Sequence, residues 1–118
     1  MTSEVDETAQ SVSGEGEDIR ELDALAEAIL SLKNADELAR FLRDLCTRAE
    51  LEALAHRWLI ARLLEEGLPY LAVADQADAS TTTVTRVSQW LHHGAGGYRL
   101  ALDRTKAKRS NPGKAGRQ

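Results

Sequence analysis

The chain has 118 residues, of which 42% are apolar, and a formal net charge of −4. This length predicts a single domain with an apolar core, and the one cysteine, Cys46, excludes both an internal disulfide and a zinc site built from cysteines. No stretch approaches the roughly 18 apolar residues of a membrane span, and the first residues show no signal region, so we expect a cytoplasmic protein.

The charge is distributed unevenly along the chain. Residues 1–23 carry a net charge of −7, whereas residues 99–118 carry +6. The acidity therefore belongs largely to one end of the chain, and the negative total does not exclude a nucleic-acid partner. Residues 1–17 lack hydrophobic periodicity and are expected to be a disordered acidic tail.

Two helices are predicted in the first part of the chain. Apolar residues recur at helical spacing from Asp18 to Leu32, which predicts the first helix. Asn34, with Glu37 three residues later, has the pattern of a helix N-terminus and predicts a second helix. The buried face of this second helix is expected to consist of Leu38, Phe41, Leu42 and Leu45.

The third predicted helix is the longest. Thr47 and Glu50 have the spacing of a capping box, and Gly67 marks the end of the helix, which is expected to run to about Glu66. Its apolar residues cover more than one stripe: Leu51, Leu54, Ala55, Trp58, Leu59, Ile60, Leu63 and Leu64. A helix that is apolar on most sides lies at the centre of its core. In so short a chain, this predicts burial against a second copy.

Residues 69–91 have the pattern of two short helices joined by a tight turn. Pro69 suits the first turn of a helix, and the apolar face of that helix is formed by Val73, Ala74 and Ala77. Asp78 can adopt the left-handed conformation that closes a helix, and Ser80 is a favourable N-cap for the next one. The second helix has apolar residues at i, i+3 and i+7, namely Val84, Val87 and Leu91. This is the pattern of a helix-turn-helix, whose second helix enters the major groove of DNA.

The outward face of this second helix carries side chains that can contact DNA. By elimination, the exposed residues are Thr81, Thr82, Thr85 and Arg86. Threonine bonds to bases or phosphates, and arginine pairs with guanine or phosphate. Together with Tyr70 and Ser80, these residues are the candidate DNA-binding set. The alternative is a helical hairpin whose threonines are merely solvated. Against it, β-branched threonines are poor helix formers, so helix propensity alone does not explain why they occur here.

The remainder of the chain predicts a last helix and no catalytic site. His92 and His93 point to different sides of a helix, so they are expected to cap the helix end and not to form a metal site. The last helix begins at Tyr98, and residues 106–118 are expected to be a basic, disordered tail that contacts phosphates or stays solvated. The sequence has no glycine-rich phosphate loop and no HExxH motif, and Cys46 has no evident base partner, so we expect neither an enzyme nor a cofactor.

From Asn34 to Leu102 the chain resembles the Trp repressor superfamily, and within it the YerC/YecD subgroup. The resemblance rests on FLRDLCTRAELEALAHRW, the break at Gly67, ASTTTVTRVSQWL and HHGAGGYRLAL, in this order. It implies an all-α, Trp-repressor-like domain over residues 18–105 that forms an intertwined homodimer. Such a protein would be a transcriptional regulator of bacterial type, a repressor that binds double-stranded operator DNA.

The resemblance also implies where a ligand pocket would lie. The Trp repressor holds tryptophan between two arginines, whose positions match Arg57 and Arg86, and Thr47 matches a third position near the pocket. The residue after the second arginine is a glycine in the repressor, whereas here it is Val87. The valine side chain would fill the space of the indole, and overpacking costs ~1–3 kcal/mol. The implied regulator therefore does not respond to L-tryptophan.

Three alternatives remain at this point. The chain could be a repressor that depends on tryptophan or on another small ligand. Arg57 and Arg86 could equally be solvated or contact phosphate. From another class of function, the helix-turn-helix could pack against a partner protein, which would make the chain a protein-interaction module.

Overall fold

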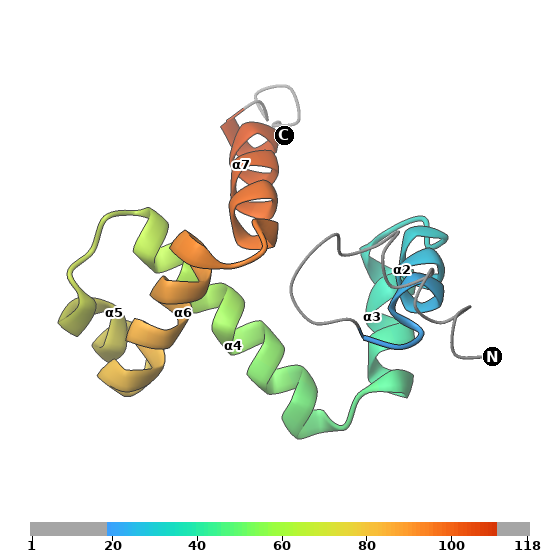
Figure 1. Cartoon of the computed structure of the whole chain (residues 1–118), viewed down its shortest axis with the longest axis horizontal. Helices are drawn as coiled ribbons and strands as arrows, with labels where there is room; N and C mark the ends of the chain where they lie inside the picture. Colours follow the sequence, from blue (N-terminus) through green and yellow to red (C-terminus); the bar gives the residue numbers. More distant parts are fainter. Residues whose placement is uncertain (1–18, 111–118) are drawn as a thin grey trace. The chain divides into compact units, whose positions relative to one another are not determined.

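The computed structural model describes residues 19–110, which form six helices and no strand (Figure 1). The all-α class is confirmed. The helices are α2 (Leu22–Leu30), α3 (Ala35–Leu45), α4 (Arg48–Glu65), α5 (Tyr70–Ala77), α6 (Thr81–His93) and α7 (Gly97–Ser110). The chain divides into two units, one ending at Leu51 and one beginning at Glu52.

The helices of the N-terminal unit begin at the capping residues that the sequence predicts. Asn34 Oδ1 accepts a hydrogen bond from the N–H of Glu37 at 2.9 Å. Thr47 Oγ1 accepts from the N–H of Glu50 at 3.1 Å, and Glu50 Oε1 accepts from the N–H of Thr47 at 2.8 Å. This reciprocal pair is a complete capping box and satisfies two donors that the helix itself leaves unpaired.

Helix α2 is shorter than expected. It begins at Leu22 and ends at Leu30, whereas the periodicity predicted a helix from Asp18 to Leu32. The reason for the late start is Glu21, whose φ of 62° and ψ of 10° place it in the left-handed region. A residue in that region cannot lie inside a right-handed helix.

Apolar side chains of the N-terminal unit remain accessible to water. None of residues 19–51 is buried. The predicted burial of the α3 face is therefore wrong for a single chain: Leu38, Phe41 and Leu42 are half-buried, and Leu45 is 52% exposed. Within residues 19–51 of one chain this face stays partly accessible to water, and uncovered apolar area forgoes about 25 cal/mol per Å² of stabilisation.

The C-terminal unit contains the buried core, which is built from α4, α5, α6 and α7. Its members are Ile60, Ala61, Leu63, Val73, Ala77, Val84, Val87, Leu91 and Leu102. The predicted apolar spacing in α6 is confirmed, since Val84, Val87 and Leu91 are all buried. In α4, burial within one chain is limited to the C-terminal half, and Leu54 and Ala55 are exposed. The burial of the other apolar residues against a second copy stays a prediction.

Helices α5 and α6 are joined by a three-residue turn, as predicted. Asp78 ends α5 in the left-handed conformation, with φ 55° and ψ 51°. Ser80 then begins α6, because its Oγ accepts from the N–H of Thr83 at 3.1 Å. Pro69 lies immediately before α5 as its N-cap and not within its first turn.

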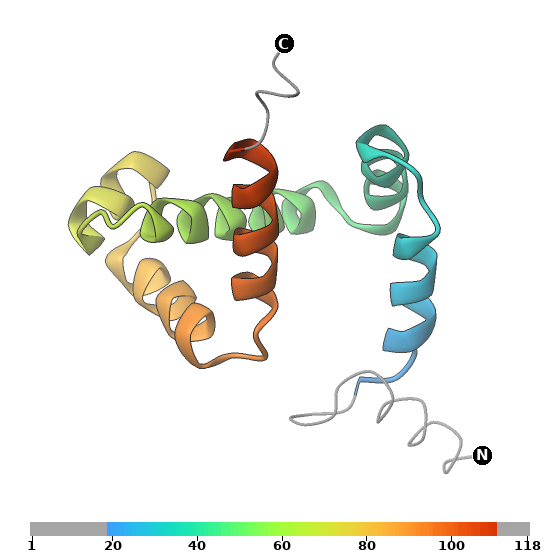
Figure 2. The ribbon, with the colours of Figure 1, turned by 90° about the horizontal axis from the view of Figure 1, so that it is seen from above.

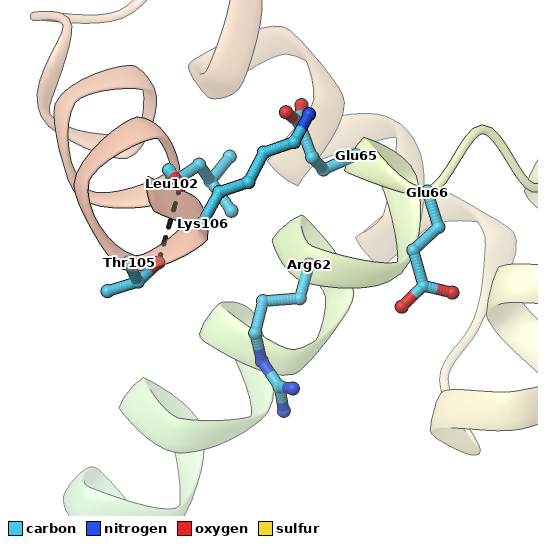
Figure 3. Close-up of a pocket in the computed structure, with 6 residues that line it drawn as sticks. All are labelled: Arg62, Glu65, Glu66, Leu102, Thr105 and Lys106. Atoms are coloured by element: carbon cyan, nitrogen blue, oxygen red, sulfur yellow. Dashed lines mark hydrogen bonds between the residues drawn. The ribbon is translucent and has the colours of Figure 1, made fainter. Parts of the chain in front are cut away.

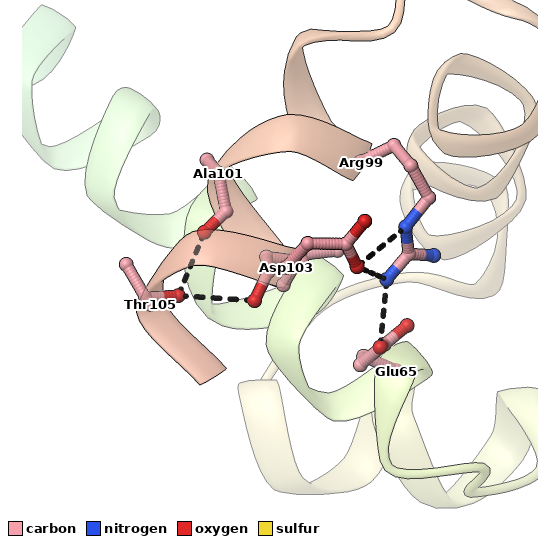
Figure 4. Close-up of polar contacts among 6 residues, drawn as sticks. Glu65, Arg99, Ala101, Asp103 and Thr105 are labelled. Atoms are coloured by element: carbon pink, nitrogen blue, oxygen red, sulfur yellow. Dashed lines mark hydrogen bonds and ion pairs between the residues drawn. The ribbon is translucent and has the colours of Figure 1, made fainter. Parts of the chain in front are cut away.

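Helix α7 crosses α4 (Figure 2), and the two are connected by an ion pair and by stacked rings. The Arg99 guanidinium lies 2.7 Å from Glu65 in α4 and 2.9 Å from Asp103 in its own helix (Figure 4). Hydrogen bonds to Glu65 and then Asp103 raise the pKa of Arg99, which therefore keeps its charge. The rings of Trp58 and Tyr98 are parallel, with centroids 6.4 Å apart.

Helix α7 extends further than predicted. It begins at Gly97 and continues past residue 105 to Ser110, so the predicted end of the helical domain at residue 105 is too early. Lysine and arginine are good helix formers that also suit a helix C-terminus, which explains how the basic segment continues the helix. The disorder predicted for residues 1–17 and 111–118 concerns residues outside the described part of the chain.

Candidate nucleic-acid interface

The exposed face of α6 gathers polar side chains around a shallow hollow. Its lining residues are Thr81, Thr82, Thr85, Arg86 and Gln89. The first four are the residues predicted from the sequence, and all four are exposed. Gln89 was not predicted, although it follows Thr85 by four positions and Arg86 by three and so had to share their face. The face offers hydroxyl, amide and guanidinium groups, which are the groups that contact base edges and phosphates.

The length and the N-terminus of α6 suit a helix that approaches DNA. Thirteen residues give a length of about 20 Å, compared with about 12 Å for the width of the major groove. Ser80 Oγ caps the helix: it accepts a hydrogen bond from the N–H of Thr83 and donates one to Thr83 Oγ1, both at 3.1 Å. Ser80 therefore acts through the geometry of the helix start, where backbone N–H groups can bind an anion.

Tyr70 lies at the start of α5 and makes a hydrogen bond to a side chain of α6. Its hydroxyl group makes a hydrogen bond with Ser88 Oγ. Ser88 is 4% exposed and lies within the apolar stripe of α6, so no sequence pattern indicates it as a functional residue. Tyr70 is 43% exposed, and its side chain reaches the surface from the neighbouring helix.

A second hollow lies between α4 and α6. It is lined by Ala53, His56, Arg57, Thr83, Arg86, Val87 and Trp90. The structure thus brings together Arg57, Arg86 and Val87, three of the four predicted pocket residues. The fourth, Thr47, belongs to the N-terminal unit, where its side chain caps α4. The Val87 side chain is fully buried in the core, and Trp90 adds a half-exposed indole that the sequence did not indicate as a pocket residue.

A third hollow lies between α4 and α7 (Figure 3). It is lined by Arg62, Glu65, Glu66, Leu102, Thr105 and Lys106. Arg62 Nε is buried and has no hydrogen-bond partner within residues 19–110. The Thr105 hydroxyl donates a hydrogen bond to the carbonyl oxygen of Ala101 at 2.8 Å (Figure 4). The lining mixes both signs of charge and does not select one class of ligand.

Two further findings concern the described helices. No group of three or more His, Cys, Asp or Glu side chains in residues 19–110 is placed to hold a metal ion. Over the same residues, no helix combines the length and the apolar character that crossing a lipid bilayer requires.

Comparison with known proteins gives consistent matches. The family model described as Trp repressor protein matches residues 20–106. The uncharacterized protein YerC of Bacillus subtilis is 46% identical over 87 residues, which are 74% of this chain and 84% of YerC. A TrpR-like protein from Eubacterium eligens has a similar structure, with a TM-score of 0.68 and 39% identity over 72% of this chain and 88% of that one.

A proposed Trp repressor from Staphylococcus aureus also matches, with a TM-score of 0.68 and 38% identity over 72% of this chain and 85% of that one. The matched family is one of DNA-binding transcription regulators and not of enzymes. The extent of the family match and the identity to YerC lead to the same assignment: the chain belongs to the Trp repressor family and is YerC-like within it.

Proposed function

We propose that the chain is a cytoplasmic transcriptional repressor that binds operator DNA as a homodimer through α5 and α6, and that it does not respond to L-tryptophan. The observation that carries this proposal is the division of α6 into two faces. One face is buried through Val84, Val87 and Leu91, and the other presents Thr81, Thr82, Thr85, Arg86 and Gln89. A helix held in this way can insert its polar face into a major groove.

The polar residues of α6 would have different tasks. Arg86 and the backbone N–H groups at the start of α6 would supply affinity through phosphate contacts, assisted by the basic residues near the C-terminus. Thr81, Thr82 and Thr85 would supply specificity, because threonine hydroxyl and methyl groups distinguish base edges. Gln89 lies about one turn beyond Thr85 and would extend this surface towards the edge of the groove.

Homodimerisation is supported by the apolar surface that one chain leaves uncovered. The N-terminal unit has no buried residue between 19 and 51, although α3 carries a regular apolar face. A second copy offers apolar surface of matching extent, and burying one leucine side chain stabilises by about 1.5–3 kcal/mol. A dimer would also present two α6 helices to successive major grooves over a roughly palindromic operator.

Independence from tryptophan is supported by the position of Val87. Its side chain is fully buried and lines the hollow that also contains Arg57 and Arg86. Because a β-branched side chain is stiff, it cannot easily move aside for an indole ring. The alternative is a repressor that depends on tryptophan or another small ligand in this hollow, and the two arginines and the Trp90 indole favour that reading.

Selection of bound sequences from random duplex DNA tests the proposed function. We expect recovery of a two-fold symmetric site whose half-sites lie about one helical turn, or 10 base pairs, apart. Affinity for this site should fall steeply with salt concentration, because bound phosphates release counterions. Failure to recover any sequence, together with weak binding that salt does not change, would support a protein-interaction module instead.

A further inference from the structure

A chain of hydrogen bonds connects the two helices of the proposed DNA-binding unit. The Tyr70 hydroxyl in α5 bonds to Ser88 Oγ in α6. One turn further along α6, His92 Nδ1 lies 2.8 Å from the Ser88 carbonyl oxygen and 3.4 Å from Ser88 Oγ. Among residues 19–110, Ser88 Oγ has these two partners only. The network thus joins the exposed start of α5 to the last turn of α6.

The contacts of His92 and Ser88 determine which atoms donate. A carbonyl oxygen only accepts, so the 2.8 Å contact requires that His92 Nδ1 carries a hydrogen. That nitrogen therefore cannot accept the hydrogen of Ser88 Oγ. The remaining acceptor is the Tyr70 oxygen, and a buried hydroxyl hydrogen without an acceptor is strongly unfavourable. Ser88 is therefore the donor to Tyr70.

This direction leaves the hydrogen of the Tyr70 hydroxyl without a partner inside the described part of the chain. Tyr70 is 43% exposed, so this hydrogen can be directed to a ligand at the surface. We propose that Tyr70 donates a hydrogen bond to a DNA phosphate oxygen, and that Ser88 and His92 are positioning residues that turn its hydroxyl outward. This inference rests on the proposed function and names one of its contacts and the groups that prepare it.

Phosphate is a better match than a base edge for this donor. In helix-turn-helix units the first helix crosses the sugar–phosphate backbone, while the second enters the groove, and Tyr70 is the first residue of α5. Tyrosine hydroxyls are among the neutral groups that contact phosphates. A fixed donor that needs no reorientation on binding loses little conformational freedom.

A double-mutant cycle on DNA binding tests this inference, using the sequences recovered by the selection from random duplex DNA. We expect Tyr70→Phe to weaken binding roughly tenfold, which is the size of one hydrogen bond to a charged group. The loss should be similar for all recovered sequences. The slope of affinity against salt should be unchanged, because a neutral donor releases no counterion.

Ser88→Ala should weaken binding by about three- to tenfold, and the variant Tyr70→Phe with Ser88→Ala should bind within about twofold of Tyr70→Phe alone. If Ser88 only positions the Tyr70 hydroxyl, its removal costs no further affinity once that hydroxyl is gone. If Ser88 had a purely structural role, its loss of affinity would add to that of Tyr70→Phe. His93→Ala is the matched control for His92→Ala, because the His93 side chain is exposed and lies next to the His92 ring without a hydrogen bond to any residue between 19 and 110. Circular dichroism checks that each variant keeps its helices.

The outcomes separate the inference from the function on which it rests. If the unmodified chain binds no duplex DNA, the proposed function fails, and the inference fails with it. If the unmodified chain binds and Tyr70→Phe binds equally well, only the inference is overturned. Fully additive losses for the Tyr70 and Ser88 substitutions would overturn the positioning role of Ser88.

Discussion

His56 in α4 donates a hydrogen bond from Nε2 to the carbonyl oxygen of Ala77, the last residue of α5, at 2.7 Å. The last carbonyls of a helix lack partners within the helix, and this bond satisfies one of them from another element. It thereby fixes the end of α5, and so the start of the turn to α6, against the long helix. We therefore expect this bond to help orient the polar face of α6.

His56→Ala should therefore destabilise the fold and loosen the α5–α6 pair. We expect a loss of about 0.5–1.5 kcal/mol in the free energy of unfolding, the usual net value of one hydrogen bond, measured by urea denaturation. His93→Ala provides the comparison, because that side chain is exposed and should change stability by less than about 0.5 kcal/mol. Equal stability of the two variants would contradict the role assigned to His56.

The apolar face of α3 provides a test of the homodimer. Leu45→Lys places a charge on this face at a residue that is 52% exposed in one chain, so it should spare the single chain and weaken the dimer by about tenfold or more. Asp44→Lys introduces the same side chain at the neighbouring, exposed position and should leave the dimer intact. Analytical ultracentrifugation at micromolar concentration measures both. A well-folded monomer of the unmodified chain would disprove the dimer.

Trp58→Glu should disrupt folding or association more severely. Trp58 stacks on Tyr98, and a carboxylate in its place would be partly desolvated and unpaired. We expect a lower melting temperature together with loss of the dimer, followed by circular dichroism and ultracentrifugation. Trp58→Phe keeps an apolar ring and should retain both properties.

L-tryptophan should neither bind appreciably nor change operator affinity. Val87 is buried and lines the hollow in which we propose that an indole would lack space, and the chain should hold α6 ready without a ligand. Isothermal titration calorimetry should give no binding heat. Val87→Gly removes the obstacle and can admit the indole, at a cost of ~1 kcal/mol from helix propensity in addition to the lost burial. A dissociation constant in the range of tens of micromolar for the unmodified chain, coupled to tighter operator binding, would contradict this account.

Removal of residues 1–17 should tighten DNA binding at low salt. This segment carries five acidic residues and no basic one, so it should repel phosphates. Because salt screens such repulsion, the difference between the truncated and full chains should disappear as ionic strength rises. Gel-shift titrations at several salt concentrations measure this. A fall of many degrees in the melting temperature on truncation would show instead that the segment is structural.

The helix starts and the α5–α6 turn could be predicted because their signals are local. Asn34, Thr47 and Ser80 cap helices through residues three positions away, and Asp78 closes α5 by its own backbone conformation. The exposed face of α6 also follows from periodicity, and the same periodicity places Gln89 beside Thr85 and Arg86.

Features that depend on distant partners could not be predicted in the same way. The bond between Tyr70 and Ser88 joins residues 18 positions apart, and no local pattern selects a serine inside an apolar stripe. The burial of Leu45 was predicted from an amphipathic pattern, but the pattern does not say whether the covering surface comes from the same chain.

The salt dependence of DNA binding, compared between the unmodified chain and Arg86→Ala, tests the central claim most directly. Arg86 lies exposed on the polar face of α6, and Thr82→Ala on the same face serves as the neutral comparison. We predict that Arg86→Ala weakens binding to every recovered sequence and reduces the slope of log affinity against log salt by about one per arginine removed, whereas Thr82→Ala changes which sequences are preferred. Unchanged affinity of Arg86→Ala at every salt concentration would contradict the account.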